Sequence, residues 1–446
     1  MTDRVCIIGA GSSGITTAKI LADAGVDFDC FEKGSGVGGN WRYDNDNGMS
    51  SAYASLHINT SKTLMQYSDY PMPERYPDYP GHAEILAYFE TYLDHFRLRD
   101  RITFDTEVAN VAPRRSGGFT VTIRDDAGRE EERDYRAVLV ANGHHWDARW
   151  PDFAGTLDDG VEVIHSHYYR TPTSLTGKRV LIVGIGNSAV DIACEACRVA
   201  ERTVLSTRRS AYIFPKYVMG VPTDQMIDPR VNKLPFAVQV RLAKAAIFLA
   251  VGNQESYGVR KPKHAIHQAH PTISDELLHL VGHGRITMKP NVAQLEGDHV
   301  RFVDQTREPF DVVIYSTGYQ VSFPFFDRDV IDPVGNEVRL YRRVVHPEIE
   351  GLYFIGLIQP LGAIMPLAEL QSRWVAGLLT GKMELPARRK MDKEIDAYQR
   401  AVRDRYVSSP RHTIQVDFHP YIEELEHEMR RAKRRAGGLF GRARRR

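Results

Sequence analysis

The sequence VCIIGAGSSG at residues 5–14 joins a short apolar run to a glycine-rich turn. Four consecutive apolar residues are typical of a parallel strand that is buried on both faces. In the GxGxxG turn, Gly9 permits the tight turn, Gly11 lets the backbone approach a pyrophosphate, and Gly14 lets the next helix pack on the strand. We predict that helix over residues 15–24 and expect phosphates at its positive N-terminal end.

A carboxylate follows at the end of the next predicted strand. That strand covers residues 27–31 and is followed by Glu32, roughly 20 residues after the turn, the position from which an acid binds the hydroxyls of an adenosine ribose. A carboxylate would repel a 2'-phosphate. The first site therefore suits FAD or NAD better than NADP.

The same pattern recurs in the middle of the chain. A second apolar strand, at residues 179–183, leads into a GxGxxA turn and a helix, and the strand after that is followed by Arg208 and Arg209 in place of an acid. Because arginine pairs with a 2'-phosphate, this second unit is predicted to bind NADP. The alternative is that both arginines are ordinary surface charges. The turn consists of Gly184, Ile185, Gly186, Asn187, Ser188 and Ala189.

A last apolar strand, at residues 351–356, lies beyond the second unit and is expected to rejoin the first sheet. The predicted fold class is α/β, with two Rossmann-like dinucleotide-binding domains and the NADP domain inserted into the FAD domain. We also expect helices at 83–96 and 366–379 and antiparallel strands at 106–111 and 118–124. The predicted domains are 1–165 (FAD, first part), 166–320 (NADP), 321–428 (FAD, second part) and 429–446 (a basic, disordered tail).

Composition narrows the cellular setting and the partners of the 446-residue chain. Nine of its 58 Lys and Arg lie after Met429, with no acid among them, so the body is acidic and the tail basic. A solvated tail is favoured over one that touches anionic membrane or nucleic acid. The chain has only four cysteines and no apolar run of roughly 18 residues. We therefore expect a soluble cytoplasmic protein that is not integrated into a membrane and does not bind nucleic acid. A homodimer is left open.

Several further motifs resemble those of one enzyme family. They are Gly38-Gly39-Asn40-Trp41, Ile58-Asn59-Thr60-Ser61-Lys62, Gly143-His144-His145, Ser316-Thr317-Gly318-Tyr319 and the long run from Leu352 to Pro366, which includes Gly356. They resemble the flavin-containing monooxygenases, class B flavoprotein monooxygenases that depend on FAD and NADPH. The resemblance covers residues 5–381.

One identifying sequence motif of that family, FxGxxxHxxx(Y/F), is altered in this chain. Four residues instead of three separate Gly160 from His165, and Asp158 stands where the pattern has an aromatic residue, while Tyr169 is in place. The resemblance implies that this linker meets the nicotinamide, so the change bears on how reduction is coupled to oxygenation.

The resemblance implies a reaction and a set of site residues. NADPH would reduce the flavin, O2 would add to it as a C4a-hydroperoxide, and a soft nucleophilic nitrogen or sulfur of a small amine or sulfide would attack that intermediate. Asn59 matches the family's catalytic asparagine, whose amide can donate and accept hydrogen bonds without changing charge. The expected cofactor-binding residues are Gly9, Gly11, Ser13, Gly14, Glu32, Gly39, Asn40, Trp41, Asn59, Thr60, Gly184, Gly186, Asn187, Ser188, Ala189, Arg208, Arg209 and Gly356.

Three other functions compete with this interpretation. A Baeyer-Villiger monooxygenase acting on ketones is the runner-up, although residues 160–169 lack the tryptophan expected there. A disulfide reductase would use Cys194 and Cys197, but both fall inside the helix after the second turn. A non-catalytic redox sensor has no feature in its favour.

His264, His267 and His270 lack the further ligands that a metal site needs, so no metal is expected.

Overall fold

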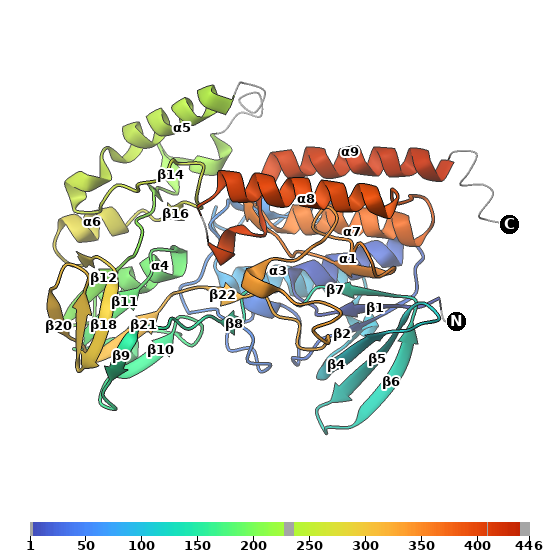
Figure 1. Cartoon of the computed structure of the whole chain (residues 1–446), viewed down its shortest axis with the longest axis horizontal. Coiled ribbons are helices and arrows are strands. Elements are labelled where there is room, and N and C mark those ends of the chain that lie inside the picture. Colours follow the sequence, from blue (N-terminus) through green and yellow to red (C-terminus); the bar gives the residue numbers. More distant parts are fainter. Residues whose placement is uncertain (1–2, 227–235, 408, 438–446) are drawn as a thin grey trace.

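The computed structural model describes residues 3–226, 236–407 and 409–437. This part of the chain contains two parallel five-stranded sheets, each the centre of one unit (Figure 1). The first sheet has the order β23-β7-β1-β2-β3 and the second β10-β21-β11-β12-β17. The first sheet consists of β1 Val5–Ile8, β2 Phe28–Phe31, β3 Ile102–Thr103, β7 Ala137–Val140 and β23 Leu352–Phe354.

The first sheet is covered on both faces, which explains its continuous apolar strands. Val5 and Ile7 point into a core formed with the helices α1 (Ser12–Asp23), α3 (His82–His95) and α7 (Met365–Leu379). Cys6 and Ile8 point to the opposite face, which packs against the antiparallel strands β4 (Thr106–Pro113), β5 (Phe119–Asp125) and β6 (Glu130–Tyr135). The helices and antiparallel strands predicted in these regions are confirmed.

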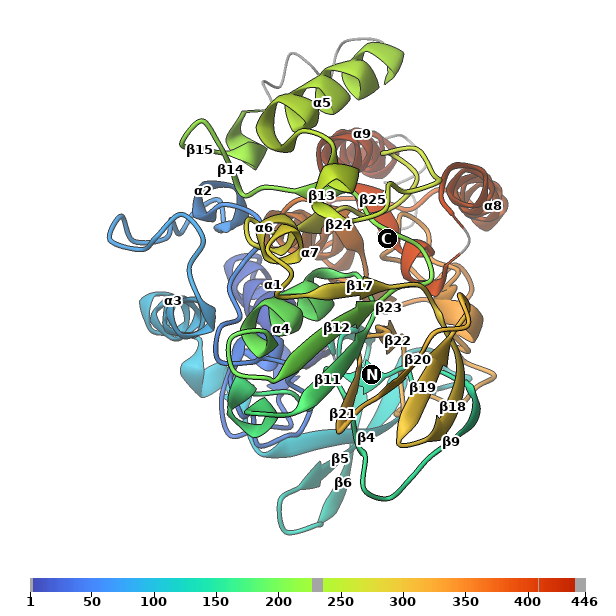
Figure 2. The ribbon, with the colours of Figure 1, turned by 90° about the vertical axis from the view of Figure 1, so that its left-hand side faces the viewer.

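The second unit repeats this layering, as Figure 2 shows. Val180 and Ile182 face the helices α4 (Asn187–Ala196) and α6 (Leu277–Gly282), whereas Leu181 and Val183 face a small sheet. The parallel strands are β10 Glu162–His165, β11 Arg179–Val183, β12 Arg202–Ser206, β17 Thr287–Lys289 and β21 Val312–Tyr315. The small sheet consists of β9 Ala154–Leu157, β18 Val292–Gly297, β19 His299–Phe302 and β20 Arg307–Pro309.

Two short strands mark where the chain crosses between the units. β8 (Asp147–Ala148) leaves the first unit and pairs antiparallel with β22 (Tyr319–Gln320), which returns to it. β23 then pairs with β7, so the expectation that the last apolar strand rejoins the first sheet is confirmed. The second unit is inserted into the first.

The predicted boundary at residue 165 is wrong, because β9 and β10 pair within the sheets of the second unit. We place the boundary between β8 and β9. The two strands were missed because most of their side chains are exposed or only half-buried, so they lack the apolar pattern of a buried strand.

The C-terminal part of the chain returns across both units. It consists of α8 (Arg388–Arg405), β25 (Gln415–Asp417), which pairs with β24 (Gln359–Leu361), and α9 (Phe418–Gly437). Both helices lie on the same side of the first unit as α7 (Figure 1). The remaining elements are α2 Lys62–Met65, α5 Phe236–Val251, β13 Ile213–Phe214, β14 Tyr217–Val218, β15 Val221–Pro222 and β16 Thr272–Ile273.

The prediction of a disordered tail from residue 429 is wrong as far as residue 437. These residues continue α9, in which Ala432 and Ala436 are buried and Arg435 forms an ion pair with the buried Glu428. The excess of basic charge concealed the small apolar residues at helical spacing. Residues 438–446 lie outside the described part of the chain.

Across the described ranges, no helix combines the length and the apolar character needed to cross a membrane.

Candidate functional site

The first glycine turn has the geometry that its sequence predicts. Gly9 has a φ of 95°, and a Cβ added there would lie 2.8 Å from the carbonyl oxygen of Ala141. A Cβ added at Gly14 would lie only 1.9 Å from the carbonyl oxygen of Gly9. No side chain caps the N-terminus of α1 at Gly11. Its first backbone N–H groups are therefore open to an anion.

Two other glycine segments close around this turn. The loop at Gly39, with a φ of 52°, approaches so closely that a Cβ added there would lie 3.2 Å from the Cα of Gly11. A Cβ added at Gly356, after β23, would lie 2.2 Å from the Oγ of Ser13. The backbone N–H of Gly356 donates a hydrogen bond to the Oε1 of Gln371. Side chains are excluded at both positions. The result is a cradle of bare backbone at the carboxyl end of the first sheet.

Glu32 lies beside this cradle and is almost fully buried. Its Oε2 accepts a hydrogen bond from the Ala10 N–H at 2.8 Å, and its Oε1 accepts from the Gly34 N–H at 2.9 Å and the Asn47 amide at 3.0 Å. These bonds fix the carboxylate at the end of β2. Because each oxygen carries two lone pairs, Oε2 can still accept a hydrogen bond from a ribose hydroxyl.

The neighbouring Gly39–Trp41 segment is a single 3-10 turn. The Oδ1 of Asn40 accepts hydrogen bonds from the Ser51 N–H at 2.9 Å and the Ser51 hydroxyl at 2.7 Å. Trp41 is half-buried and packs against the first core. Asn40 thus anchors the loop that follows the cradle, while Trp41 contributes an apolar side chain.

The second glycine turn has the same geometry. Gly184 has a φ of 143°, an added Cβ there would lie 2.5 Å from the carbonyl oxygen of Ser316, and Gly186 is the N-cap of α4 without a capping side chain. Asn187 accepts a hydrogen bond from the Ile273 N–H at 3.0 Å and so holds β16 beside the turn. Ser188 is half-buried at the start of α4, and Ala189 is fully buried under it.

Both predicted arginines follow the end of β12, as the sequence indicated. Arg208 and Arg209 are exposed. Within the described residues, the Arg208 side chain has no hydrogen-bond or ion-pair partner. It is therefore a cation at the carboxyl end of a strand next to the second turn, which is where a 2'-phosphate would be recognised.

Asn59 lies in a segment of the first unit that contacts the second unit. It is half-buried, and its amide makes no hydrogen bond to a described residue; Thr60, beside it, is buried. Before it in the chain, the Tyr53 hydroxyl donates to Asp191 of α4 at 2.6 Å, and after it the Ser61 N–H donates to Asp224 at 2.6 Å. These two contacts hold the Asn59 segment against the second unit.

The altered linker brings histidines close to the crossing strands. His165 ends β10, is fully buried, and lies 5.4 Å from Tyr319, measured between ring centroids. Burial lowers the pKa of His165 to about 4, helped by His167 nearby. Tyr169 is buried in the second core and donates to Glu195 at 2.5 Å. Despite the altered spacing, Tyr169 therefore has a structural anchor, and His165 is neutral at pH 7.

Cys194 of α4 and Cys197, the residue that caps its C-terminus, pack as core residues. Cys194 and Cys197 are free thiols buried in the core between α4 and the second sheet, and burial raises the pKa of both. A redox pair needs an accessible thiolate. Their environment argues against the disulfide-reductase alternative.

The described residues contain no group of three side chains suited to bind a metal.

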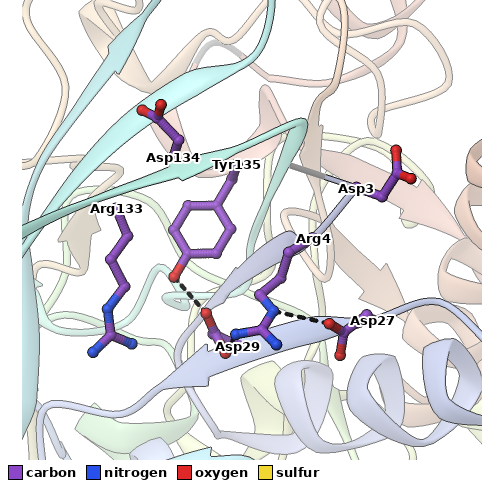
Figure 3. Close-up of a pocket in the computed structure, with 7 residues that line it drawn as sticks. All are labelled: Asp3, Arg4, Asp27, Asp29, Arg133, Asp134 and Tyr135. Atoms are coloured by element: carbon purple, nitrogen blue, oxygen red, sulfur yellow. Dashed lines mark hydrogen bonds and ion pairs between the residues drawn. The ribbon is translucent and has the colours of Figure 1, made fainter. Parts of the chain in front are cut away.

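A surface cavity of about 300 Å³ lies at the other end of the first sheet (Figure 3). Its lining includes Arg4, which forms ion pairs with Asp27 at 2.9 Å and Asp29 at 3.2 Å, and Tyr135, which donates to Asp29 at 2.7 Å. These residues stand at the amino ends of the strands, whereas open α/β sheets bind ligands at the carboxyl ends. We assign this cavity no role in the reaction.

Sequence reasoning missed the residues that connect the two units. Tyr53 and Asp191 carry no motif, and neither does Lys216, whose Nζ contacts the Nε2 of His57 close to Asn59. Burial lowers the pKa of Lys216 to about 8. In the sequence, the motif from Ile58 to Lys62 pointed to this region, but it did not indicate its partners in the second unit.

Comparison with known proteins identifies the family. The chain matches the Flavin-binding monooxygenase-like family over residues 2–435. It belongs to that family. Flavin-containing monooxygenase 5 of Rattus norvegicus is 38% identical over 95% of this chain and 82% of the relative. Dimethylaniline monooxygenase [N-oxide-forming] 2 of the same species is 34% identical over 96% and 83%.

Solved structures agree with this assignment. The S-allyl-L-cysteine S-oxygenase of Allium sativum aligns with a TM-score of 0.72 and 26% identity over 96% of this chain and 89% of that one. This flavin-binding monooxygenase is therefore an α/β enzyme of two dinucleotide-binding units that uses FAD and NADPH. The bare glycine turns and the uncapped starts of α1 and α4 fit the phosphates of these two cofactors.

Proposed function

We propose that this monooxygenase transfers one oxygen atom of O2 to a nitrogen or sulfur atom of a small amine or sulfide. Two relatives support this class of substrate, because one is named as N-oxide-forming and the other as an S-oxygenase. The observation that carries the proposal is the position of Asn59. Its neutral amide is unpaired within the described residues, and its segment is fixed between the two cofactor units.

The first unit would hold FAD. The N–H groups at the start of α1 and the bare backbone at Gly11, Gly39 and Gly356 would surround its pyrophosphate, and Glu32 would accept from its ribose. Ser13 lies against Gly356, and Asn40 and Trp41 fix the loop beside the cradle. When bound, the flavin supplies the redox chemistry, accepting hydride from NADPH and activating O2.

The second unit would hold NADPH. The turn from Gly184 to Ala189 would take the pyrophosphate at the start of α4. Arg208, with Arg209 beside it, would pair with the 2'-phosphate that distinguishes NADPH from NADH. The absence of a described partner for Arg208 supports this role.

Asn59 would act where the two cofactors meet. Its amide can donate a hydrogen bond to an oxygen atom and accept one from the nicotinamide, without bringing a charge that attracts water. Tyr53 and Ser61 hold the segment on either side through Asp191 and Asp224. Orientation of this kind limits the loss of activated oxygen as hydrogen peroxide.

A substrate panel tests the proposed reaction class. The purified, FAD-loaded enzyme is given NADPH with a tertiary aromatic amine, a thioether or a cyclic ketone, and the products are separated and identified by mass. We expect an N-oxide or a sulfoxide and no lactone. A lactone as the main product would favour the Baeyer-Villiger alternative and contradict the proposal.

Because all four cysteines are free and buried, we also propose a reducing compartment, the cytoplasm, as the location.

A further inference from the structure

A single arginine from the C-terminal part of the chain reaches the second glycine turn. Arg411 belongs to the 3-10 helix Pro410–His412, between α8 and β25. A Cβ added at Gly186 would lie 3.5 Å from its Nη1. Gly186 is the glycine at which the backbone of such a turn approaches a pyrophosphate. The guanidinium thus lies beside the expected path of the cofactor.

No described carboxylate forms an ion pair with Arg411. Within the described residues, its guanidinium has no ion pair or hydrogen bond. The charge of Arg411 acts on three histidines from three different segments, His145, His270 and His412, and contributes to lowering the pKa of each. None of the three can balance the arginine, because an imidazole is either neutral or positively charged.

The position of Arg411 is enclosed but open to a ligand. Burial of the guanidinium among protein atoms lowers the pKa of Arg411 to about 10. The side chain nevertheless remains exposed. An exposed cation without a partner among the described residues is a place where an anion can bind.

We propose that Arg411 binds the pyrophosphate of NADPH, opposite the N-terminus of α4; this inference rests on the second site described above. The planar fork of an arginine can donate two parallel hydrogen bonds to phosphate oxygens. Arg208 and Arg411 would then bind different phosphate groups of the same cofactor. Arg208 recognises the 2'-phosphate, which only NADPH carries, whereas Arg411 binds the group that NADPH and NADH share.

The segment that carries Arg411 is attached to both units. The Val407 N–H donates to the carbonyl oxygen of Gln268 in the second unit at 2.9 Å. After Arg411, the Thr413 hydroxyl donates to the carbonyl oxygen of Asn336 at 2.6 Å, and β25 pairs with β24 of the first unit. Binding of the pyrophosphate would therefore add a further attachment and tie α8 and α9 to the nucleotide site.

The test compares Arg411→Ala and Arg411→Lys with the control Arg403→Ala. Arg403 lies on α8 with a side chain that is 59% exposed and pairs with Glu337 away from the glycine turn. The dissociation constants of NADP⁺ and NAD⁺ are measured by titration calorimetry on oxidised, FAD-loaded enzyme, so that no turnover is needed. Flavin absorbance per protein confirms that each variant has retained FAD and its fold.

We expect Arg411→Ala to weaken NADP⁺ and NAD⁺ by the same factor, about 10- to 100-fold, because one charge-assisted contact is lost. Arg411→Lys, which keeps the charge but loses the fork, should lie between, and Arg403→Ala should bind as wild type does. A loss confined to NADP⁺ would assign Arg411 to the 2'-phosphate and overturn the inference. Unchanged binding of both nucleotides would also overturn it. If wild type itself bound neither, the second site as a whole would be wrong.

If Arg411→Ala lost FAD or failed to fold, Arg411→Lys would decide the matter by the same measurement. The single ammonium group of lysine cannot reproduce the two parallel hydrogen bonds of the guanidinium. Equal weakening of NADP⁺ and NAD⁺ in that variant supports the inference. Wild-type affinity for both would contradict it, because the fork would then be unnecessary.

Discussion

Asp191→Asn should make the stability of the enzyme depend less on pH. Asp191 lies in α4 directly after the second turn, and burial raises the pKa of its carboxyl from 3.8 to about 7, while the Tyr53 hydroxyl donates to it at 2.6 Å. A folded pKa above the unfolded one means that unfolding releases a proton between pH 4 and 7. Stability is therefore lost as the pH rises through this range, by about 1.4 kcal/mol per pH unit.

The total effect follows from the size of the shift. About three pH units correspond to roughly 4 kcal/mol, of which about 2 to 3 kcal/mol falls between pH 5 and 8. The asparagine of the variant still accepts a hydrogen bond from Tyr53 but cannot ionise. The free energy of unfolding of Asp191→Asn minus that of wild type should therefore increase from pH 5 to 7 and stay level above that.

Urea unfolding of the FAD-loaded proteins at pH 5, 6, 7 and 8 measures this difference. Asp311→Asn is the control, because Arg179 holds the pKa of the Asp311 carboxyl at about 2, which leaves it charged in both states over the whole range. Its difference from wild type should be flat. A flat difference for Asp191→Asn as well would show that Asp191 is ionised in the folded enzyme and would refute the reasoning.

Three further changes test the cofactor sites and the C-terminal helix. Arg208→Ala and Arg209→Ala, singly and together, should lower the ratio of NADPH to NADH efficiency by about tenfold or more, since a charge-assisted contact is lost; an unchanged ratio would mean that neither arginine binds the 2'-phosphate. Asn59→Asp should leave flavin reduction intact but raise the hydrogen peroxide released per NADPH, because a carboxylate cannot donate the amide hydrogen bond; peroxide release equal to that of wild type would withdraw the catalytic role of Asn59. Truncation after Met429 should lower the unfolding temperature, because it removes buried residues of α9 and the ion pair of Arg435; an unchanged temperature would show that this last part of the helix contributes nothing.

The sequence was sufficient for the central strands of the two sheets because these strands are buried on both faces. A run such as residues 179–183 is apolar throughout, and a glycine turn directly after it leaves few alternatives. The strand β23 could be predicted for the same reason, although it is shorter than the predicted range 351–356. β9 and β10 could not, since their exposed side chains follow no apolar pattern.

The contacts between the units were beyond sequence reasoning. Tyr53 and Asp191 are 138 residues apart, and a tyrosine or an aspartate outside a motif gives no sign of its partner. Arg411 lies past the last motif in a stretch rich in arginines, where a surface role is the default expectation. Only its approach to Gly186 in the folded chain distinguishes it.

The most direct test of the central claim is the fate of labelled oxygen. The FAD-loaded enzyme is supplied with NADPH, ¹⁸O2 and an amine or thioether that it consumes, and the product is analysed by mass spectrometry. The account predicts one ¹⁸O atom in each molecule of N-oxide or sulfoxide, with NADPH consumed in equal amount. NADPH oxidation that yields only labelled hydrogen peroxide, with no label in any organic product, would contradict it and describe an oxidase.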